Sequence, residues 1–368
     1  MSVTKLGMPK WGMSMSEGKL VAWLVEEGAE LTQGMEIAEV ETEKINGLVE
    51  SPAAGVLRRR VAQVGEELPV GALLGVIADA SVPDAEIDAF VEEFQASFVP
   101  GGSDDDEAGA TTTVEAGGRT FRTTRMGSGD ETVVLVHGFG GDLTTWLFTQ
   151  AALAESRTAI TLDLPGHGGS SKDVGDGSLA TLAAALGDAL DALEVERAHL
   201  VGHSLGGAVA VELARTQPAR VASLVLIASA GLGPEINGEY VEGFLAAESR
   251  NQIKPVLQLL FADPAVVTRQ LCEDVLKVKR IDGVQGALRA IADQVFPGGR
   301  QAIDLAGALA ELDVPVLAIW GDADRIVPPA HATALPARAR VEVLPGAGHS
   351  PMLEAAGDVN RIILEFLG

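Results

Sequence analysis

The chain of 368 residues has one cysteine, one tyrosine and few aromatic residues, which make up 4% of the total. Cys272 has no second cysteine to pair with, so a disulfide framework and a cysteine-based metal site are both excluded, and no metal centre is expected. No apolar run approaches the roughly 18 residues of a transmembrane helix. The N-terminus shows no basic stretch followed by an apolar one, so no signal peptide is visible. We therefore expect a cytoplasmic protein.

Basic residues are also scarce, because 27 Lys and Arg stand against 52 Asp and Glu and give a net charge of −25. Such an imbalance opposes binding to nucleic acids and to anionic membranes, and we expect neither as a partner. Hydrophobic residues make up 47% of the chain, which suits a globular protein with buried cores. At about 150 residues per domain, the length predicts two domains.

One lysine stands in an acidic, strand-like run, Glu41-Thr42-Glu43-Lys44-Ile45. The apolar pattern around it predicts two short strands, with Lys44 near the turn between them at a hairpin tip in solvent. Nothing would desolvate a lysine there, so its pKa has no reason to fall and it would be a poor catalyst. It would be a good attachment point, although a plain solvated lysine is the alternative interpretation.

Residues 1–80 resemble a lipoyl domain, the swinging-arm carrier of 2-oxo-acid and acetoin dehydrogenase complexes. The motifs that carry the resemblance occur in the family's order: Lys5-Leu6-Gly7-Met8-Pro9, Met15-Ser16-Glu17-Gly18, the run around Lys44, and Ser51-Pro52-Ala53-Ala54-Gly55. Biotinyl carriers share the fold but have methionines on both sides of their lysine, where this chain has Glu43 and Ile45. The resemblance implies an all-β flattened barrel, or sandwich, with lipoate attached covalently to Lys44.

Residues 81–118 are predicted to be a linker. After Pro83-Asp84, apolar residues recur at helical spacing and predict a short amphipathic helix: Ile87, Phe90, Val91, Phe94 and Phe98. This helix would either dock against a flanking domain or offer its apolar face to a partner subunit. The acidic run Asp104–Glu107 and Thr111 to Thr113 lack any period and predict a flexible, self-repelling tether. The linker has too little apolar sequence for the subunit-binding domain that acyltransferase chains usually carry here.

Residues 119–368 alternate β-branched apolar runs with Ala- and Leu-rich helical stretches, which predicts a mostly parallel sheet covered on both faces. The predicted strands include Val133–Val136, Ala159–Leu162, His199–Val201, Leu224–Ile227, Val316–Ile319 and Val341–Val343. Helical patterns interrupt the alternation from 232 to 300. This insertion is a candidate lid over the carboxyl edge of the sheet.

Two motifs at predicted strand ends suit acyl chemistry. Gly202-His203-Ser204-Leu205-Gly206 is a G-x-S-x-G pattern between a strand and a helix, where a sharp turn lifts the serine hydroxyl above the sheet. His137-Gly138-Phe139-Gly140-Gly141 follows an earlier strand, and its glycines let the Phe139 N–H point into the site. Together with the N–H of Leu205, it would form an oxyanion hole.

Two later motifs offer an acid and a base. Asp324 follows the strand that ends near Ile319, and His349 lies in Pro345–Pro351. The chain order Ser204, Asp324, His349 is the one that the α/β-hydrolase layout requires. A serine hydroxyl is barely nucleophilic near neutral pH, so a histidine must take its proton and a carboxylate must hold that histidine. Asp322 competes with Asp324 for the role of the acid.

This half of the chain resembles the α/β-hydrolase family over its whole length, including the run Asp163-Leu164-Pro165-Gly166-His167-Gly168. The resemblance implies Ser204 as nucleophile, Asp324 as acid and His349 as base, with Phe139 and Leu205 as oxyanion donors. His137 and His167 are interpreted as structural partners of the loop backbone.

A dense basic cluster lies within the predicted lid and consists of Lys277, Lys279 and Arg280. Such a cluster in an otherwise acidic protein could meet the phosphates of coenzyme A. A solvated helix face is the competing interpretation.

A lipoyl carrier joined to an α/β-hydrolase domain resembles the dihydrolipoyl acetyltransferase components of acetoin dehydrogenase systems, and the H-x-x-x-D-G motif of ordinary lipoyl acyltransferases is absent from the sequence. The resemblance implies acetyl transfer from lipoyl-Lys44 to coenzyme A in a homo-oligomer. Its implied partners are thiamine-diphosphate-dependent acetoin dehydrogenase subunits, dihydrolipoyl dehydrogenase, and a lipoate ligase or lipoyl transferase. A serine hydrolase of thioesters, esters or carbon–carbon bonds with an appended carrier, and an inert scaffold, remain open as alternatives.

Overall fold

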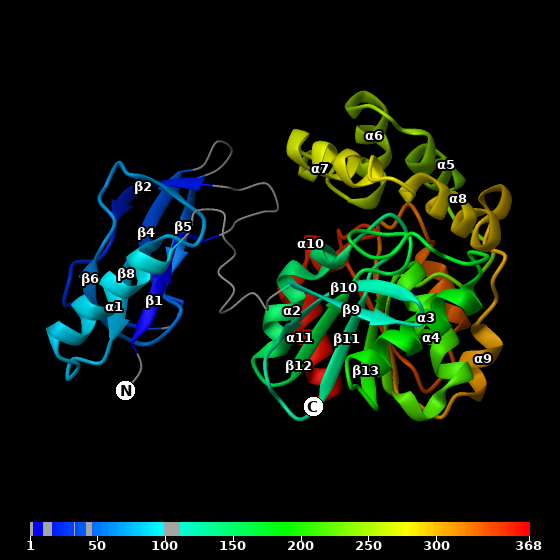
Figure 1. The fold of residues 1–368 in the computed structure, drawn as a ribbon, viewed down its shortest axis with the longest axis horizontal. Coiled ribbons are helices and arrows are strands. Elements are labelled where there is room, and N and C mark those ends of the chain that lie inside the picture. The colour runs from blue at the N-terminus through cyan, green and yellow to red at the C-terminus, as the bar shows by residue number, and fades with distance from the viewer. Residues whose placement is uncertain (1–2, 10–16, 33, 42–45, 99–110) are drawn as a thin grey trace. The chain divides into compact units, whose positions relative to one another are not determined.

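The structure, a computed structural model, describes residues 3–9, 17–32, 34–41, 46–98 and 111–368, without the side chains of residues 46, 93, 96 and 97. The chain divides into two compact units, residues 1–105 and 106–368 (Figure 1). In the described ranges, no helix combines the length and the apolar character needed to cross a membrane.

The first unit is a sandwich of two antiparallel sheets, with strand orders β1-β8-β6-β3 and β5-β4-β2-β7. Its strands are β1 (Thr4–Gly7), β2 (Glu17–Trp23), β3 (Glu30–Leu31), β4 (Glu36–Glu41), β5 (Asn46–Glu50), β6 (Gly55–Arg60), β7 (Glu67–Pro69) and β8 (Leu73–Ala78). Leu20 and Ile37 of one sheet and Leu57 of the other belong to one buried apolar cluster. The all-β sandwich predicted from the sequence is thus confirmed.

Strands β4 and β5 form an antiparallel hairpin in which Glu41 pairs with Asn46. Lys44 falls between the ends of these strands in the sequence and lies outside the described residues. Its location at a hairpin tip therefore stays a prediction.

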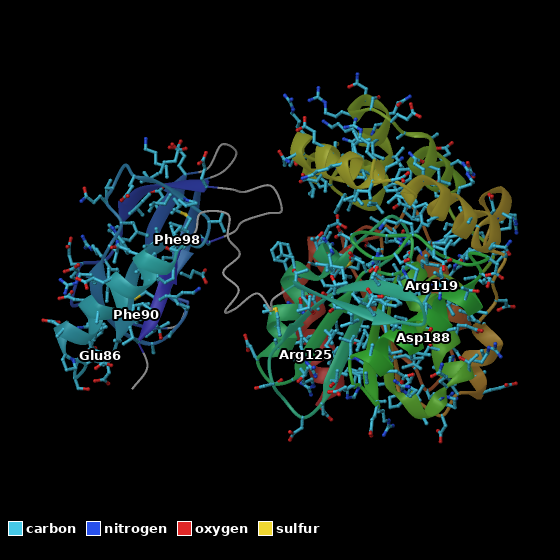
Figure 2. All side chains as sticks on the ribbon, in the orientation of Figure 1. Glu86, Phe90, Phe98, Arg119, Arg125 and Asp188 are labelled. Atoms are coloured by element: carbon cyan, nitrogen blue, oxygen red, sulfur yellow. The ribbon has the colours of Figure 1, made fainter. Side chains whose placement is uncertain are left out.

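Helix α1 (Asp84–Ser97) packs on β8 and β6 of the same unit, and Ile87 is fully buried in a cluster with Leu73 and Val76. Figure 2 shows Phe90 and Phe98 along this segment and Glu86 in its first turn. The side chain of Arg58 in β6 binds Asp84 at 2.7 Å, which fixes the start of the helix. Of the two roles that the sequence left open for this helix, docking within the chain is confirmed.

The second unit contains an eight-stranded sheet with the order β16-β15-β14-β13-β11-β12-β10-β9. The strands are β9 (Thr111–Ala116), β10 (Arg119–Met126), β11 (Thr132–Val136), β12 (Thr158–Leu162), β13 (Ala198–His203), β14 (Val221–Ile227), β15 (Val316–Gly321) and β16 (Arg340–Leu344). Strands β11 to β16 run parallel to one another, and β10 and β9 add an antiparallel edge. A mostly parallel sheet is therefore confirmed.

Alternate side chains of this sheet enter two apolar layers, as strand periodicity requires. On β11, Val133 and Leu135 join residues of α2 and α11, whereas Val134 and Val136 join residues of α3 and α4. The covering helices are α2 (Leu147–Ala154), α3 (Leu179–Ala192), α4 (Leu205–Thr216), α9 (Ala306–Glu311), α10 (Pro351–Glu354) and α11 (Ala356–Leu367). Short 3₁₀ turns lie at η1 (Leu143–Trp146), η2 (Pro218–Arg220), η3 (Gln258–Leu260), η4 (Pro264–Val266), η5 (Pro297–Gly299) and η6 (Pro329–Ala334).

The hairpin of β9 and β10 corrects one expectation, because the sequence pattern predicts Thr111 to Thr113 to lie in the tether and the second domain to begin at residue 119. Strand β9 instead pairs with β10 along its whole length. Gly117 and Gly118 both have positive φ, as a two-residue hairpin turn demands. As an edge strand, β9 exposes Thr111, Thr112 and Thr113 and has no apolar alternation, although threonine itself favours strands.

The insertion between β14 and β15 contains α5 (Gly238–Ala246), α6 (Arg250–Leu257), α7 (Arg269–Lys279) and α8 (Val284–Val295). Figure 1 shows these helices gathered beyond one end of the sheet. They occupy the range 232–300 that the sequence predicts to be a lid, and we call them the lid below.

The docking of α1 gives a testable expectation. Replacing Ile87 with alanine removes a fully buried side chain and should cost the first unit about 2–4 kcal/mol of unfolding free energy. Hydrogen exchange in β8 and α1 should then accelerate by at least tenfold, while the second unit keeps its protection. Val64→Ala, at an exposed residue of the same unit, is the control. Unchanged exchange in β8 would show that α1 does not support the sheet.

Candidate active site

Ser204 sits in a strained turn between β13 and α4, with φ 52° and ψ −116°. A non-glycine residue rarely adopts such a backbone conformation. Two glycines make the turn possible, because a Cβ on Gly202 would lie 2.5 Å from Gly207 and one on Gly206 would collide with the carbonyl of Val136. The turn thus has the geometry that the G-x-S-x-G pattern predicts.

Asp324 and His349 are hydrogen-bonded, with 2.8 Å between Oδ2 of the aspartate and Nδ1 of the histidine. Both side chains are buried, at 0% and 2% exposure. The other carboxylate oxygen of Asp324 accepts the N–H groups of Ile326 and Val327 at 2.8 and 3.0 Å, which fixes the carboxylate plane. Asp322, the competing acid, is exposed and accepts the N–H of Gly346 instead.

Among the described residues, no hydrogen bond joins Ser204 to this pair. Its neighbour His203 forms the link, because Nε2 of His203 lies 2.8 Å from the carbonyl oxygen of His349 and the two rings are 4.8 Å apart. Catalytic hydrogen bonds in a ligand-free enzyme are often long and tighten only in the substrate complex.

Each of the two predicted oxyanion donors belongs to a backbone segment that lies next to Ser204. Leu205 is the first residue of α4, where backbone N–H groups have no partner within the helix. The loop of Phe139 passes over the serine, since a Cβ on Gly138 would lie 3.1 Å from Cβ of Ser204. Gly140 has φ +73°, and Gly141 N–H donates to the carbonyl of Gly138 at 3.1 Å, so the loop is a tight turn.

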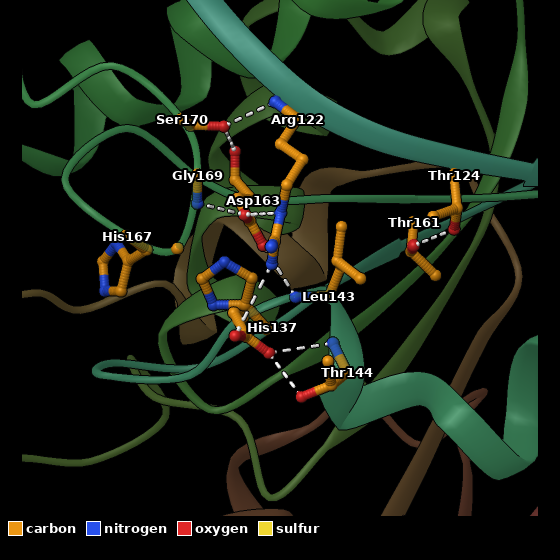
Figure 3. A network of polar contacts seen from close by, with 12 residues as sticks. Arg122, Thr124, His137, Leu143, Thr144, Thr161, Asp163, His167, Gly169 and Ser170 are labelled. Carbon is orange, nitrogen blue, oxygen red and sulfur yellow. Dashed lines mark hydrogen bonds and ion pairs between the residues drawn. The ribbon is translucent and has the colours of Figure 1, made fainter. Parts of the chain in front are cut away.

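A buried carboxylate, Asp163, holds this loop and the one after β12 together, as Figure 3 shows. It accepts Nε of Arg122 at 2.6 Å, the N–H of Leu143 at 2.7 Å and the N–H of Gly169 at 2.6 Å. A Cβ on Gly168 would collide with it, so only glycine fits there. Sequence reasoning missed Arg122 because it lies on β10, a strand that was not predicted.

Three buried histidines surround the site as neutral groups, because burial lowers the pKa of His137, His167 and His203, that of His167 to about 3. Nε2 of His137 accepts the N–H of Leu164 at 3.0 Å, so its Nδ1 carries the proton and donates to the carbonyl of Gly138 at 2.8 Å. Nδ1 of His167 bonds the carbonyl of Pro165 at 3.0 Å. The interpretation of His137 and His167 as partners of the loop backbone is confirmed.

The basic lid cluster is not a free anion site. The Lys279 ammonium is buried and donates to carbonyls at the end of α5, those of Phe244, Leu245 and Ala247. Lysine side chains are long enough to point inward from an amphipathic helix, which the sequence pattern could not distinguish from a solvated position. Lys277 and Arg280 are exposed, as the solvated-face interpretation expects.

Glu354 is a further residue that sequence reasoning missed. One of its carboxylate oxygens accepts the N–H of Gly348 and the other that of Ala262, each at 2.7 Å, so it ties the His349 loop to the lid. Burial raises the pKa of this carboxyl group. The signal that the sequence offered for Glu354 is its position five residues after His349, at the end of the short helix α10.

The comparisons with known proteins cover both units. The family described as alpha/beta hydrolase fold matches residues 131–356, and the family described as biotin-requiring enzyme matches residues 4–77. Over 364 residues the chain is 51% identical to the dihydrolipoyllysine-residue acetyltransferase component of the acetoin cleaving system of Pseudomonas putida, with 98% of each chain covered. The component of the same name from Cupriavidus necator is 46% identical over 367 residues, which cover 100% of this chain and 98% of the relative.

Among solved structures, a meta-cleavage product hydrolase from Pseudomonas fluorescens is similar to the second unit. The TM-score is 0.64 at 25% identity, with 70% of this chain and 97% of the hydrolase covered. The α/β-hydrolase fold expected from the sequence is thereby confirmed.

The buried histidines give a prediction for stability against pH. Each has a pKa below its unfolded value of 6.5, so below about pH 6.5 the unfolded chain binds protons that the folded chain does not, and stability falls. The His167→Phe variant lacks one group that binds a proton on unfolding. Between pH 6 and 4, the slope of its unfolding free energy against pH should therefore be shallower than that of the parent by about 1.4 kcal/mol per pH unit. Urea unfolding of the second unit at each pH measures it.

The control for this experiment is the range above pH 7, where the curves of the variant and the parent should run parallel because His167 is neutral in both states. Parallel curves down to pH 4 as well would contradict a neutral, buried His167.

Proposed function

The chain belongs to the family of dihydrolipoyllysine-residue acetyltransferase components of acetoin cleaving systems, and we propose that it carries an acetyl group on lipoylated Lys44 and transfers it to coenzyme A through Ser204, Asp324 and His349. Two observations favour transfer over hydrolysis. The carrier unit is on the same chain as the proposed triad, and the chain is similar over its full length to acetyltransferase components. A triad alone would serve water as readily.

The residues around Lys44 suit a lipoyl group. The described strands β4 and β5 bring Glu41 and Asn46 opposite each other, and Lys44 falls between these two residues in the sequence. Glu43 and Ile45 flank the lysine where biotin carriers have methionines. When attached, lipoate supplies a thiol that bears the acetyl group as a thioester.

In the proposed first half-reaction, Ser204 Oγ attacks the thioester carbonyl while His349 Nε2 takes its proton. Asp324, bonded to Nδ1 at 2.8 Å, holds the imidazole in the required tautomer and stabilises it when it is charged. The N–H groups of Phe139 and Leu205 receive the developing oxyanion. His349 then gives its proton to the departing dihydrolipoyl thiol.

In the second half-reaction, His349 takes the proton of the coenzyme A thiol, the sulfur attacks the acetyl-serine, and the Ser204 oxygen leaves with that proton. The strained turn at Ser204 and its bonded acid–base pair support an acyl-serine route over direct activation of the thiol. Removal of one oxyanion donor typically lowers kcat by about 10²–10³-fold, and we expect an effect of that order here.

As a component of an acetoin cleaving system, the chain acts together with the other components of that system. We assign the loading of the lipoyl arm to a thiamine-diphosphate-dependent acetoin dehydrogenase and its reoxidation to dihydrolipoyl dehydrogenase. Attachment of lipoate falls to a lipoate ligase or lipoyl transferase, and the acyltransferase is proposed to be a homo-oligomer.

The carrier role is tested by intact mass of the chain purified from its native host. A single lipoyl increment is expected, and it should vanish in Lys44→Arg together with acetyl-CoA formation from acetoin by the reconstituted system. The control is transfer from free acetyl-dihydrolipoamide, which Lys44→Arg should retain because the triad is intact. An unmodified lysine in a host that makes lipoate would overturn the carrier role.

The triad is tested by Ser204→Ala and His349→Ala with acetyl-dihydrolipoamide and coenzyme A. Both should lower kcat by about 10⁴-fold or more, since members of a triad act as a unit. If Ser204→Ala keeps its rate while His349→Ala loses it, the thiol is activated directly and no acyl-serine forms. Release of free acetate without any need for coenzyme A would instead make the enzyme a hydrolase.

A further inference from the structure

The only tyrosine of the sequence lies on lid helix α5 and reaches the oxyanion loop. Tyr240 is buried, and its hydroxyl donates to the carbonyl oxygen of Phe139 at 3.3 Å. The first turn of α5 is fixed by Asn237, whose side chain accepts the N–H groups of Glu239 and Tyr240 at 3.0 and 3.3 Å. The lid therefore makes a polar contact with a residue proposed to act in catalysis.

The Phe139 N–H belongs to the same peptide as the carbonyl of Gly138, and in a trans peptide the two point in opposite directions. That carbonyl is held by two donors, Gly141 N–H at 3.1 Å and Nδ1 of His137 at 2.8 Å. Gly140, the third residue of this turn, has φ +73°, so the central Phe139–Gly140 peptide has the orientation of a type II turn. Holding the Phe139 carbonyl stabilises that shape, because the central peptide of such a turn is the one that can flip.

A second contact from the same face of α5 comes one turn later. The ring of Phe244 lies 6.0 Å from that of Phe139, and a Cβ on Gly140 would lie 2.5 Å from it. Residues four apart on a helix lie on one side, so Tyr240 and Phe244 contact the loop together. Phe296, at the end of α8, packs on the Phe139 ring at 5.9 Å.

The other end of α5 is secured by Lys279. Its buried ammonium donates to the carbonyls of Phe244, Leu245 and Ala247 and lies 5.0 Å from the Phe244 ring. Cations stabilise the carboxyl end of a helix and also the face of an aromatic ring. Helix α5 is thus fixed at both ends, and a movement of the lid would carry Tyr240 and Phe244 away from the loop.

We propose that Tyr240 is a positioning residue that couples the seating of the lid to the oxyanion hole. With α5 seated, its hydroxyl holds the Phe139–Gly140 peptide and thereby the direction of the Phe139 N–H toward the thioester carbonyl. Displacement of α5 releases the peptide and weakens the hole. This inference rests on the proposed role of Phe139 in catalysis.

Tyr240→Phe tests the proposal, since the ring and its packing stay and only the hydroxyl is lost. We expect kcat for acetyl transfer to fall about tenfold, less than for loss of a donor itself, while KM for coenzyme A changes less than about twofold. The rate at which a fluorophosphonate labels Ser204 should fall by a similar factor, because that reaction also develops an oxyanion. An unchanged kcat and labelling rate would overturn the proposal.

The matched control is Thr158→Val, which removes a partly buried hydroxyl bond to the carbonyl of Gly129 at 2.8 Å, at the start of β12 in the same unit. It should lower stability without changing kcat or labelling. If Ser204→Ala retains full activity, the proposed acyl-serine route fails. If Ser204→Ala abolishes activity while Tyr240→Phe does not change it, only the role of Tyr240 fails.

A readout that needs no variant comes from 3-fluorotyrosine, because the single tyrosine gives one ¹⁹F resonance. Phosphonylation of Ser204 fills the oxyanion hole and should shift this resonance. A resonance that stays in place on phosphonylation would show that Tyr240 does not sense the hole, and would overturn the proposal.

Discussion

The burial of one carboxylate, Asp163, is the constraint on which the site depends. A buried charge is tolerated only when it is paired and hydrogen-bonded, and here Arg122 supplies the opposite charge while the N–H groups of Leu143 and Gly169 supply the bonds. These amides belong to two different loops, so satisfying the carboxylate fixes both loops against β10. The turn of residues 138–141, which we call the oxyanion turn, approaches Ser204 at Gly138 and is followed in the chain by Leu143, which is bonded to Asp163. These two contacts limit where the turn can lie.

The loops at the sheet supply only part of the geometry, and the lid supplies the rest. Glu354 bridges Gly348 and Ala262, and Arg325, next to Asp324, donates to the carbonyl of Phe261 at 2.6 Å. Phe261 and Ala262 of the inserted segment are therefore bonded to the loop of the acid and, through Glu354, to the loop of the base. A strained residue such as Ser204 persists only where its surroundings over-determine it, and the lid adds to those surroundings.

The sequence was informative where chemistry requires a particular residue at a strand end. Ser204, Asp324 and His349 could be placed because glycine patterns and strand order constrain them, whereas Asp322 and Asp324 could be separated only by the geometry of the fold. Strand β9 escaped prediction because threonines on an exposed edge show no apolar alternation. Lys279 was misjudged for a related reason, since a lysine that caps a neighbouring helix looks in sequence like a solvated one. Contacts across the fold, such as that of Tyr240, leave no local pattern at all.

The choice between a thiol and water as acceptor cannot lie in the proposed triad, because a histidine base in the position of His349 would deprotonate either one. A thiol has an intrinsic advantage as a nucleophile, but water is far more abundant, so a transferase must limit the access of water to the acyl-enzyme. The buried rings of Phe139, Phe244 and Phe296 form an apolar layer beside the oxyanion turn, and two of the three belong to the lid. Helix α5, which carries Tyr240, thus also carries part of this apolar layer through Phe244.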